Sequence, residues 1–341
     1  MTADTPRPAA HLLQIEDTLL SDISAVLILG ALFKRMRPSD WSAPLNLGGR
    51  LPPAALAILT RAGVIAPGGA LTDAFVALWQ ARGPALVSRI DFILKAARDL
   101  IDHGEALLRD PEEFMQRSQV FAMFDYSQGF ETGPVARART EHWCRYVAAL
   151  SDVEGQPLSD VIAKMISATR PRRVLEVGGN IGAFARHLQA RLAVADYMIL
   201  DIPQVCAIGS DDARLSDLKI RFRPGDMHRM DWTETGKDRP DCIVFKSVLH
   251  DWPSDRVRDV LARAVAELAP EGQIVIAERC AFQATNLSPP SAADIANMVF
   301  APFYREAEVY HDLFQALDPA MGVTTSHLTL DMRWFVLVAG R

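Results

Sequence analysis

A glycine-rich turn follows a short apolar run in the second half of the chain. The run Val174–Val177 contains Glu176 and leads into a turn with the spacing E-x-G-G-N-x-G, in which the glycines are Gly178, Gly179 and Gly182. Glycines in such a turn let the backbone approach a ligand closely and let the following helix pack tightly on the strand. The spacing departs from the G-x-G-x-x-G fingerprint of dinucleotide phosphate binding. The turn alone therefore predicts a small-molecule site and leaves the class of cofactor open.

Further charged residues end the next extended stretches. Asp201 ends the second run, 25 residues after Glu176, where a carboxylate can accept both hydroxyls of a ribose. Asp226, which precedes Met227, ends a third stretch, and Lys246 ends a fourth. Because the carboxyl ends of parallel strands meet at one edge of an open sheet, we expect these side chains to line a ligand site there.

His250 lies four residues after Lys246, just beyond the predicted end of a strand. An imidazole with a pKa near ~6.5 is a suitable proton acceptor at neutral pH, so one interpretation is a general base. The other is a structural histidine that caps the following helix or packs under Trp252. Position alone leaves both interpretations open.

The elements that must position these residues alternate in type from residue 151 onward. Short apolar runs are separated by stretches with helical spacing, most clearly between residues 257 and 268. This alternation indicates a parallel sheet with crossover helices, the α/β class. The runs are Val174–Val177, Tyr197–Leu200, Asp241–Lys246 and Gln273–Ala277. A last strand-like segment, His327–Val338, predicts a terminal antiparallel hairpin on that sheet.

Residues 1–150 are predicted to be mostly helical. Between Leu12 and Phe33 the apolar residues occupy more than one helical face, so they must be covered by the domain's own fold or by a second subunit. The helix predicted over Leu51–Ile65 and the turn after it have the outline of a winged helix. Lys and Arg number 15 and Asp and Glu 16 over these residues, so the excess positive charge that phosphate binding requires is missing. We expect packing or dimerisation rather than DNA binding.

Composition bounds the remaining possibilities. With 341 residues, 49% of them hydrophobic, the chain is long enough for two domains with sizeable cores. The net charge of −6 gives no support for binding nucleic acid or an anionic membrane. The four cysteines show no metal-ligand spacing, so we expect no metal, no disulfide framework and a cytoplasmic protein. The apolar run Ile23–Phe33 is too short to span a bilayer, which needs ~20 residues, and we expect no signal peptide.

Taken in order, the segments LEVGGNIG, LDIP, PGDM, FKSVLHDWPSD and IVIAE resemble those of the S-adenosylmethionine-dependent small-molecule O-methyltransferases, the caffeic acid O-methyltransferase-like group with its bacterial antibiotic-tailoring relatives. The resemblance is strong over residues 171–280 and weaker in the first half, which looks like that family's winged-helix dimerisation domain. It implies a Rossmann-like class I methyltransferase sheet over residues 151–341, a dimerisation domain over residues 1–150, and a homodimer. The implied activity is methyl transfer from S-adenosylmethionine to a hydroxyl of an aromatic or polyketide-like small molecule.

The resemblance also implies which residues hold the cofactor. The turn at Gly178 would hold its methionine part, Asp201 its ribose hydroxyls, and Lys246 would lie against the adenosine end. The residues that would flank the adenine are Asp226 and Met227. Asn180 departs from the glycine that is common at its position, which leaves less room and implies a lower affinity for the cofactor.

The same resemblance assigns the acid–base chemistry. His250 is the implied general base and Glu278 its supporting acid, with Asp251 as a second candidate for that support. Tyr304 stands where the family usually has another acid, with Glu306 close by.

A flat apolar substrate is implied by a set of aromatic and methionine side chains that would form its wall. These are Met123, Phe124, Tyr126, Trp143, Met298 and Phe303. Four alternatives are kept: C- or N-methylation, other cofactor-dependent chemistry such as decarboxylation, a nicotinamide-dependent oxidoreductase, and a ligand-sensing winged-helix regulator. The turn spacing argues against the oxidoreductase, and the near-neutral first half argues against the regulator.

Overall fold

The computed structural model describes residues 10–341 except positions 43, 125, 127–129, 132, 193, 213–214, 230–231, 233–238, 281–291 and 331. The chain divides into two compact units: Met1–Phe124 with Leu287–Pro302, and Asp125–Asn286 with Phe303–Arg341. The division falls before the expected residue 150, because helix α7 (Pro134–Met165) runs through that position without a break.

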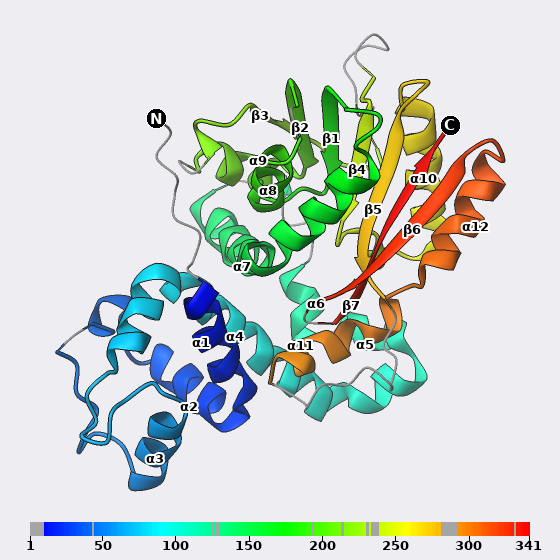
Figure 1. Ribbon diagram of the computed structural model, residues 1–341. Coiled ribbons are helices and arrows are strands. Elements are labelled where there is room, and N and C mark those ends of the chain that lie inside the picture. Colours follow the sequence, from blue (N-terminus) through cyan, green and yellow to red (C-terminus); the bar gives the residue numbers. More distant parts are fainter. Residues whose placement is uncertain are drawn as a thin grey trace. The chain divides into compact units, whose positions relative to one another are not determined.

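The first unit is helical in its described part, as the sequence predicts (Figure 1). Its longest helix, α4 (Asp73–Arg109), packs against α1 (Ala10–Ser21) and α2 (Ile23–Phe33). After α3 (Pro53–Arg61), an isolated β-bridge joins Ile65 and Leu71 across the turn that the sequence predicts there. The shorter helices are α3 (Pro53–Arg61), α5 (Pro111–Arg117), α6 (Gln119–Met123), α11 (Ala292–Phe300) and the 3₁₀ turn Pro38–Asp40.

The apolar surface of α1 and α2 is covered largely within this unit. Leu19, Leu20, Val26 and Leu29 are all buried, whereas Leu27 remains 53% exposed. The sequence left open whether the domain's own fold or a second subunit covers this apolar surface. The domain's own fold buries the greater part of it.

The second unit is built on a seven-stranded sheet with the order β3-β2-β1-β4-β5-β7-β6. Strands β1 to β5 run parallel, and β7 is antiparallel to both β5 and β6. The strands are β1 (Arg173–Val177), β2 (Asp196–Asp201), β3 (Ile220–Pro224), β4 (Cys242–Lys246), β5 (Gln273–Arg279), β6 (Gly322–Thr329) and β7 (Arg333–Gly340). The predicted α/β class and terminal hairpin are confirmed. Within the described residues, no helix is both long and apolar enough to cross a membrane.

Helices cover both faces of this sheet, with α8 in front of it and α10 behind it in Figure 1. One core joins the sheet to α7 and α8, and the other joins it to α10 and α12. Because side chains alternate between the two faces along a strand, Lys246 lies on the α7 side and Glu278 on the α10 side. The helices are α8 (Ala183–Gln189), α9 (Pro203–Ser210), α10 (Ser254–Glu267) and α12 (Ala307–Leu317).

Candidate active site

The glycine-rich turn between β1 and α8 uses backbone conformations in the left-handed region. Gly178 and Gly182 have φ of +70° and +83°, and Asn180, between them, has φ of +53°. A Cβ atom added to Gly182 would lie 2.8 Å from Cδ1 of Leu215, so the packing leaves no room for a side chain there. Asparagine adopts the left-handed region more readily than most residues. The turn therefore keeps its shape with Asn180 in place of a glycine.

Asp201 is held at the end of β2 by backbone donors. Its Oδ2 accepts the N–H of Asn180 and its Oδ1 accepts the N–H of Ile202, both at 2.8 Å. Burial raises the pKa of Asp201 to about 6, although both hydrogen bonds act against this rise. Each carboxylate oxygen has a further lone pair for another donor. The carboxylate is thus fixed beside the turn and can accept a pair of hydroxyls.

Asp226 and Met227 begin the loop after β3. Oδ1 of Asp226 accepts the N–H of His228 at 2.9 Å, and the carbonyl of Met227 accepts the indole N–H of Trp232 at 3.0 Å. Since β2 and β3 pair in parallel up to their ends, both residues lie at the same edge of the sheet as Asp201. This is the placement that the sequence predicts for them.

Glu176 and Lys246, also predicted to line the cofactor site, are engaged in buried contacts within the protein. Glu176 accepts a hydrogen bond from the Tyr197 hydroxyl at 2.8 Å. Burial raises the pKa of Glu176 to about 8, so this carboxyl is mostly protonated near neutral pH. Nζ of Lys246 lies 2.7 Å from Oε2 of Glu154 on α7, and both side chains are buried. Contact of Glu176 or Lys246 with a cofactor stays a prediction.

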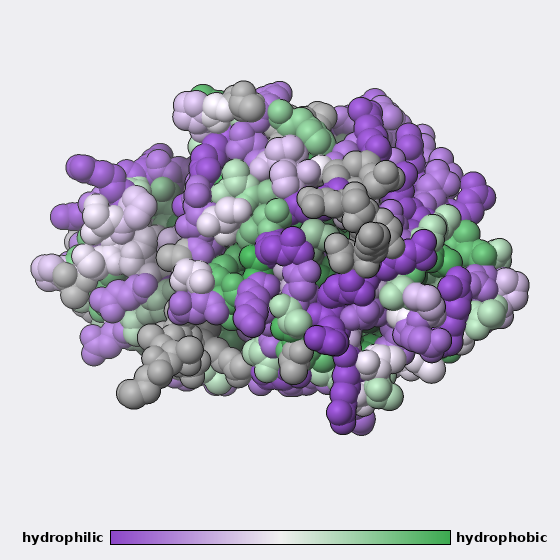
Figure 2. All heavy atoms as spheres, turned by 90° about the horizontal axis from the view of Figure 1, so that it is seen from above, coloured by the Kyte–Doolittle hydropathy of each residue, from purple (hydrophilic) through white to green (hydrophobic). Residues whose placement is uncertain are grey.

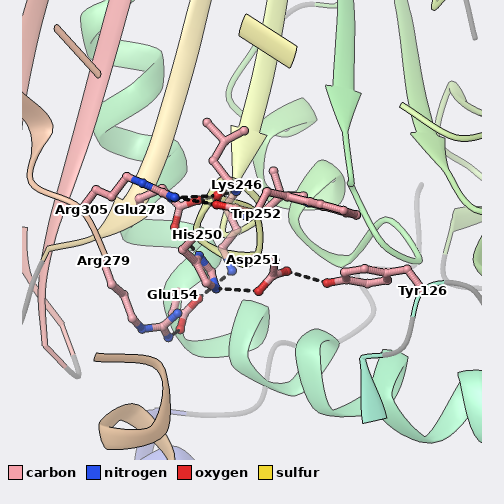
Figure 3. Close-up of polar contacts among 11 residues, drawn as sticks. Tyr126, Glu154, Lys246, His250, Asp251, Trp252, Glu278, Arg279 and Arg305 are labelled. Carbon is pink, nitrogen blue, oxygen red and sulfur yellow. Dashed lines mark hydrogen bonds and ion pairs between the residues drawn. The ribbon is translucent and has the colours of Figure 1, made fainter. Parts of the chain in front are cut away.

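Glu154 is the centre of a buried ionic cluster, Glu154, Lys246 and Arg279, that the sequence did not reveal (Figure 3). Its second carboxylate oxygen pairs with the guanidinium of Arg279 at the end of β5. Both cations face the ring of Trp334 on β7, with Nζ of Lys246 5.5 Å and Cζ of Arg279 4.3 Å from its centroid. Ion pairing and cation–π contact offset part of the cost of burying these charges. The cluster ties α7 to β4, β5 and β7.

His250 lies in a single 3₁₀ turn, Leu249–Asp251, shortly after β4. Its Nδ1 is 2.7 Å from Oε2 of Glu278, while Oε1 of Glu278 accepts the N–H groups of Val248 and Leu249 at 3.0 and 2.9 Å (Figure 3). Because an ionised carboxylate can only accept, Nδ1 carries the ring proton of the neutral imidazole and Nε2 is the basic atom. The structure therefore brings the predicted base and its predicted support into direct contact.

The surroundings of His250 act in opposite directions on its pKa. Burial by itself would lower the pKa, but the negative charges of Glu278 and Asp251 outweigh burial and raise it above the usual 6.5. For Glu278, burial would raise the pKa, and contact with His250 and two backbone N–H groups brings it below the usual 4.5. An ionised carboxylate thus supports an imidazole that takes up a proton readily, which is the arrangement that a general base requires.

Asp251 faces the other nitrogen of the imidazole. Its Oδ1 lies 3.3 Å from Nε2 of His250, and its Oδ2 accepts a hydrogen bond from the Tyr126 hydroxyl at 2.5 Å. The Tyr126 ring stacks on Trp252 at a centroid distance of 5.7 Å and meets Trp143 edge to face at 6.1 Å. Of the predicted substrate wall, Tyr126 and Trp143 therefore belong to the surroundings of the histidine.

The rest of the predicted substrate wall is divided between the two units. Phe303 lies in the second unit and is partly buried. Those in the first unit are Met123, Phe124 and Met298. There Phe124 packs against Phe92 and Phe300 at centroid distances of 5.9 and 6.1 Å, as part of an aromatic cluster within the unit. Substrate contact by these four residues stays a prediction.

Tyr304 and Arg305 close the histidine site from the segment before α12. The Tyr304 ring meets the imidazole of His250 edge to face at 5.1 Å, so an aromatic ring occupies the place where the resemblance implies an acid. Arg305 donates to the carbonyls of Leu249 and Trp252 at 3.1 and 2.5 Å, which fixes the 3₁₀ turn. Sequence reasoning missed Arg305, because nothing in the sequence distinguishes an arginine that binds backbone carbonyls from one on the surface.

Comparison with known proteins relates these features to a family. Residues 112–317, more than half of the chain, match the family model of the O-methyltransferase domain. The chain belongs to this O-methyltransferase family. Demethylspheroidene O-methyltransferase from Rhodobacter capsulatus is 29% identical over 163 residues, which cover 48% of this chain and 38% of that protein. For 3-hydroxy-5-methyl-1-naphthoate 3-O-methyltransferase from Streptomyces sahachiroi the identity is 25% over 118 residues, with coverage of 34% and 33%. The chain thus spans about a third of the length of these curated relatives.

Solved structures share the fold of this O-methyltransferase. Human N-acetylserotonin methyltransferase in complex with SAM has a TM-score of 0.68 at 15% identity, covering 100% of this chain and 99% of that one. PigF with SAH has a TM-score of 0.64 at 17% identity, covering 97% of each chain. The mitomycin 7-O-methyltransferase MmcR has a TM-score of 0.60 at 17% identity, covering 84% and 83%. At these identities the likeness concerns the fold, and it confirms the predicted class I methyltransferase architecture.

Replacing Glu154 with glutamine leaves the two cations of the ionic cluster buried without their anion. Breaking a buried ion pair from one side costs about 3–5 kcal/mol, and we expect Glu154→Gln to lower the free energy of unfolding by a large part of that amount in urea denaturation. The matched control is Asp211→Asn, which breaks an exposed pair with Arg137. This control should cost at most about 1 kcal/mol. Equal losses in the two variants would contradict the role of the cluster.

Proposed function

We propose that this O-methyltransferase transfers a methyl group from S-adenosylmethionine to a hydroxyl of an aromatic or polyketide-like small molecule, with His250 as the general base. The observation that carries the proposal is the contact between Nδ1 of His250 and Glu278, which leaves Nε2 to accept a proton beyond the carboxyl end of β4. Family membership and the names of the relatives, among them naphthoate and demethylspheroidene O-methyltransferases, support the class of reaction.

The residues at the ends of β1 and β2 fit the proposed cofactor. Asp201 has two fixed acceptor atoms for two ribose hydroxyls, and the turn that contains Gly178 borders it. The side chain of Asn180 is held by a protein contact, because its Oδ1 accepts the N–H of Ile181 at 2.8 Å. When bound, S-adenosylmethionine would supply a methyl group attached to a sulfonium sulfur. The acceptor oxygen would attack this methyl group in line with the carbon–sulfur bond, and the sulfur would leave as the thioether of S-adenosylhomocysteine.

The acceptor hydroxyl has to lose its proton as the oxygen attacks the methyl group. A phenol with a pKa near ~10 is almost entirely neutral at pH 7, so a base within hydrogen-bonding reach lowers the barrier. Nε2 of His250 takes this proton, while Glu278 holds the ring through Nδ1 and stabilises the imidazolium. Asp251 places a second negative charge beside Nε2. With Tyr304 in the place of an acid, these two carboxylates stabilise the protonated imidazole from both nitrogens.

Removing the imidazole tests this role directly. Loss of a general base typically costs about 10²–10⁴ in rate, so we expect His250→Ala to lose that much kcat with a neutral phenol while its affinity for S-adenosylmethionine is kept. A panel of aromatic hydroxy compounds with labelled cofactor supplies the substrate, and calorimetry supplies the affinity. His311→Ala, at a half-exposed histidine of α12, is the control with unchanged kcat.

The pH dependence gives a second readout for the base. Only neutral imidazole accepts the proton, so kcat/KM should rise as pH increases through the pKa of His250, which lies above 6.5. A His250→Ala enzyme with near-normal kcat on a neutral phenol would remove the histidine from the mechanism.

The cofactor assignment depends on the ionisation of Asp201. Ionised Asp201 can accept a hydrogen bond from each of two hydroxyls, and its protonation removes both a charge and an acceptor site. Because its pKa is raised to about 6, we expect the Kd of S-adenosylhomocysteine to increase as pH falls through that value, measured by titration calorimetry. Asp201→Asn should remove this pH dependence, and Asp201→Ala should weaken binding about tenfold or more, since hydrogen bonds to charged groups are worth about 1.5–3 kcal/mol. A wild-type Kd that does not change with pH would be evidence against Asp201.

We also propose that the protein forms a homodimer through its helical unit. Ile23 and Leu27 on α2 are 38% and 53% exposed, and Ile101 and Leu108 on α4 are 80% and 87% exposed. By contrast, hydrophilic side chains predominate on the face shown in Figure 2, where apolar ones form separate patches. Exposed aliphatic side chains on two helices of one unit support an interface between copies of this unit.

Light scattering at micromolar concentration should therefore give twice the chain mass of 37.6 kDa. Leu27→Glu combined with Leu108→Glu should shift the protein towards the monomer, because burying the new charges without partners is unfavourable. Val135→Glu, at a 73% exposed position of the second unit, is the matched control that should stay dimeric. A stable wild-type monomer would refute the dimer.

The proposed location and partners follow from two further observations. The four cysteines Cys144, Cys206, Cys242 and Cys280 are free and buried, which supports a reducing, cytoplasmic environment. The near-equal counts of acidic and basic residues in the first half support a small molecule, rather than nucleic acid or a membrane, as the partner.

A further inference from the structure

The two carboxylates beside His250 differ in how they are held. Glu278 accepts two backbone N–H groups in addition to Nδ1, so its charge is stabilised whether or not Nε2 carries a proton. Asp251 accepts no backbone N–H in the described part of the chain. Its contacts there are Nε2 of His250, at 3.3 Å, and the Tyr126 hydroxyl, at 2.5 Å. Burial and the charge of Glu278 raise the pKa of Asp251, and the contacts with His250 and Tyr126 act against this rise, so these two side chains favour its ionised state.

The contact between Asp251 and Nε2 opposes the reactive form of the histidine. When Nδ1 donates to Glu278 and Nε2 has lost its proton, the lone pair of Nε2 faces Oδ1 of Asp251, and two acceptors stand 3.3 Å apart. A proton between them relieves this repulsion. In the proton-free state that a base must reach, Tyr126 is the donor left to stabilise Asp251 among the described residues.

The position of Tyr126 is fixed by aromatic packing. Its ring stacks on Trp252 with an interplanar angle of 21° and meets Trp143 at 78°. Burial and then the charge of Asp251 raise the pKa of Tyr126 well above 10, so the hydroxyl remains a donor throughout the pH range in which a histidine titrates. The hydrogen bond from the Tyr126 hydroxyl to Asp251 is strongest when Nε2 of His250 carries no proton. This is the state in which the histidine can act as a base.

We propose that Tyr126 is a positioning residue that keeps Asp251 ionised and thereby sets the pH at which Nε2 of His250 becomes free to accept a proton. Its importance for turnover rests on the proposed function. The coupling among Tyr126, Asp251 and His250 is a property of the protein alone, and it can be measured without substrate or cofactor.

Several other charged or aromatic side chains lie around His250 and Asp251. The positive charge of Arg279 on β5 lowers the pKa of His250 and acts against the two carboxylates. The Tyr304 ring meets the imidazole of His250 edge to face, and the guanidinium of Arg305 donates to backbone carbonyls. On the side of Tyr126, the charged or titratable groups besides Asp251 are Asp201 and Cys144. In the described part of the chain, none of these groups takes the place of the Tyr126 hydroxyl as a donor to Asp251.

Nuclear magnetic resonance titration of the full chain with ¹³C-labelled histidine tests the coupling. The chain has eight histidines, and the His250 signal is assigned by its loss in His250→Gln. Tyr126→Phe removes the donor and destabilises the proton-free state most, so the midpoint of His250 should rise by about half to one pH unit. Asp251→Asn removes the charge that holds the proton, so the midpoint should fall.

The double variant distinguishes action through Asp251 from a general effect. Adding Tyr126→Phe to Asp251→Asn should cause no further rise in the His250 midpoint. With asparagine at position 251 there is no charge beside Nε2 for the Tyr126 hydroxyl to stabilise. Tyr197→Phe is the matched control: it removes another buried hydroxyl that donates to a carboxyl, on Glu176, and should leave the midpoint in place. An unchanged midpoint in Tyr126→Phe, or the same upward shift in both backgrounds, would overturn the proposal.

Turnover supplies a separate readout once an acceptor is known. In Tyr126→Phe the midpoint of the pH profile of kcat/KM should move to higher pH by the same amount, whatever the height of the alkaline plateau. A purely structural role would lower the plateau without moving the midpoint. A midpoint shift by nuclear magnetic resonance together with no methyl transfer to any hydroxyl would leave the coupling intact and refute the proposed function instead.

Discussion

The carboxylate of Glu278 joins three parts of the second unit at one point. It belongs to strand β5, accepts the N–H groups of Val248 and Leu249 after β4, and holds the imidazole of His250. A buried carboxylate with all of these donors remains charged, and its charge in turn raises the basicity of the histidine. Orientation, tautomer and charge of the His250 imidazole thus all depend on a single side chain at the end of a strand.

Much of this arrangement follows from local patterns. Apolar runs predicted the parallel strands, because strands covered on both faces are apolar along their whole length. The shared direction of these strands placed Asp201, Asp226 and Glu278 at one edge. The glycine-rich turn was also predictable, since Gly178 and Gly182 adopt left-handed conformations. The family resemblance added roles that no spacing contains, above all that of His250.

Contacts between side chains far apart in the chain could not be predicted from the sequence. Lys246 was expected near the cofactor because of its place after a strand, but its partner Glu154 lies 92 residues earlier on α7, where nothing in the helix pattern marks it. Tyr126 was named as a wall residue for its aromatic ring, and the ring does stack on Trp252, yet its hydroxyl also binds Asp251, 125 residues away. A tyrosine packs through its ring and hydrogen bonds through its hydroxyl, and the sequence pattern predicted only the packing of the ring.

The two hydrogen bonds from Arg305 to the carbonyls of Leu249 and Trp252 bear on the thermodynamics of ligand binding. They lie on either side of His250, so the turn that carries this histidine is ordered by the protein's own contacts. The conformational entropy of this turn is lost during folding, and ligand binding does not have to order it again. Under the proposed function, acceptor molecules would therefore be discriminated by their shape and by the acidity of their hydroxyl, rather than by how well they order this turn.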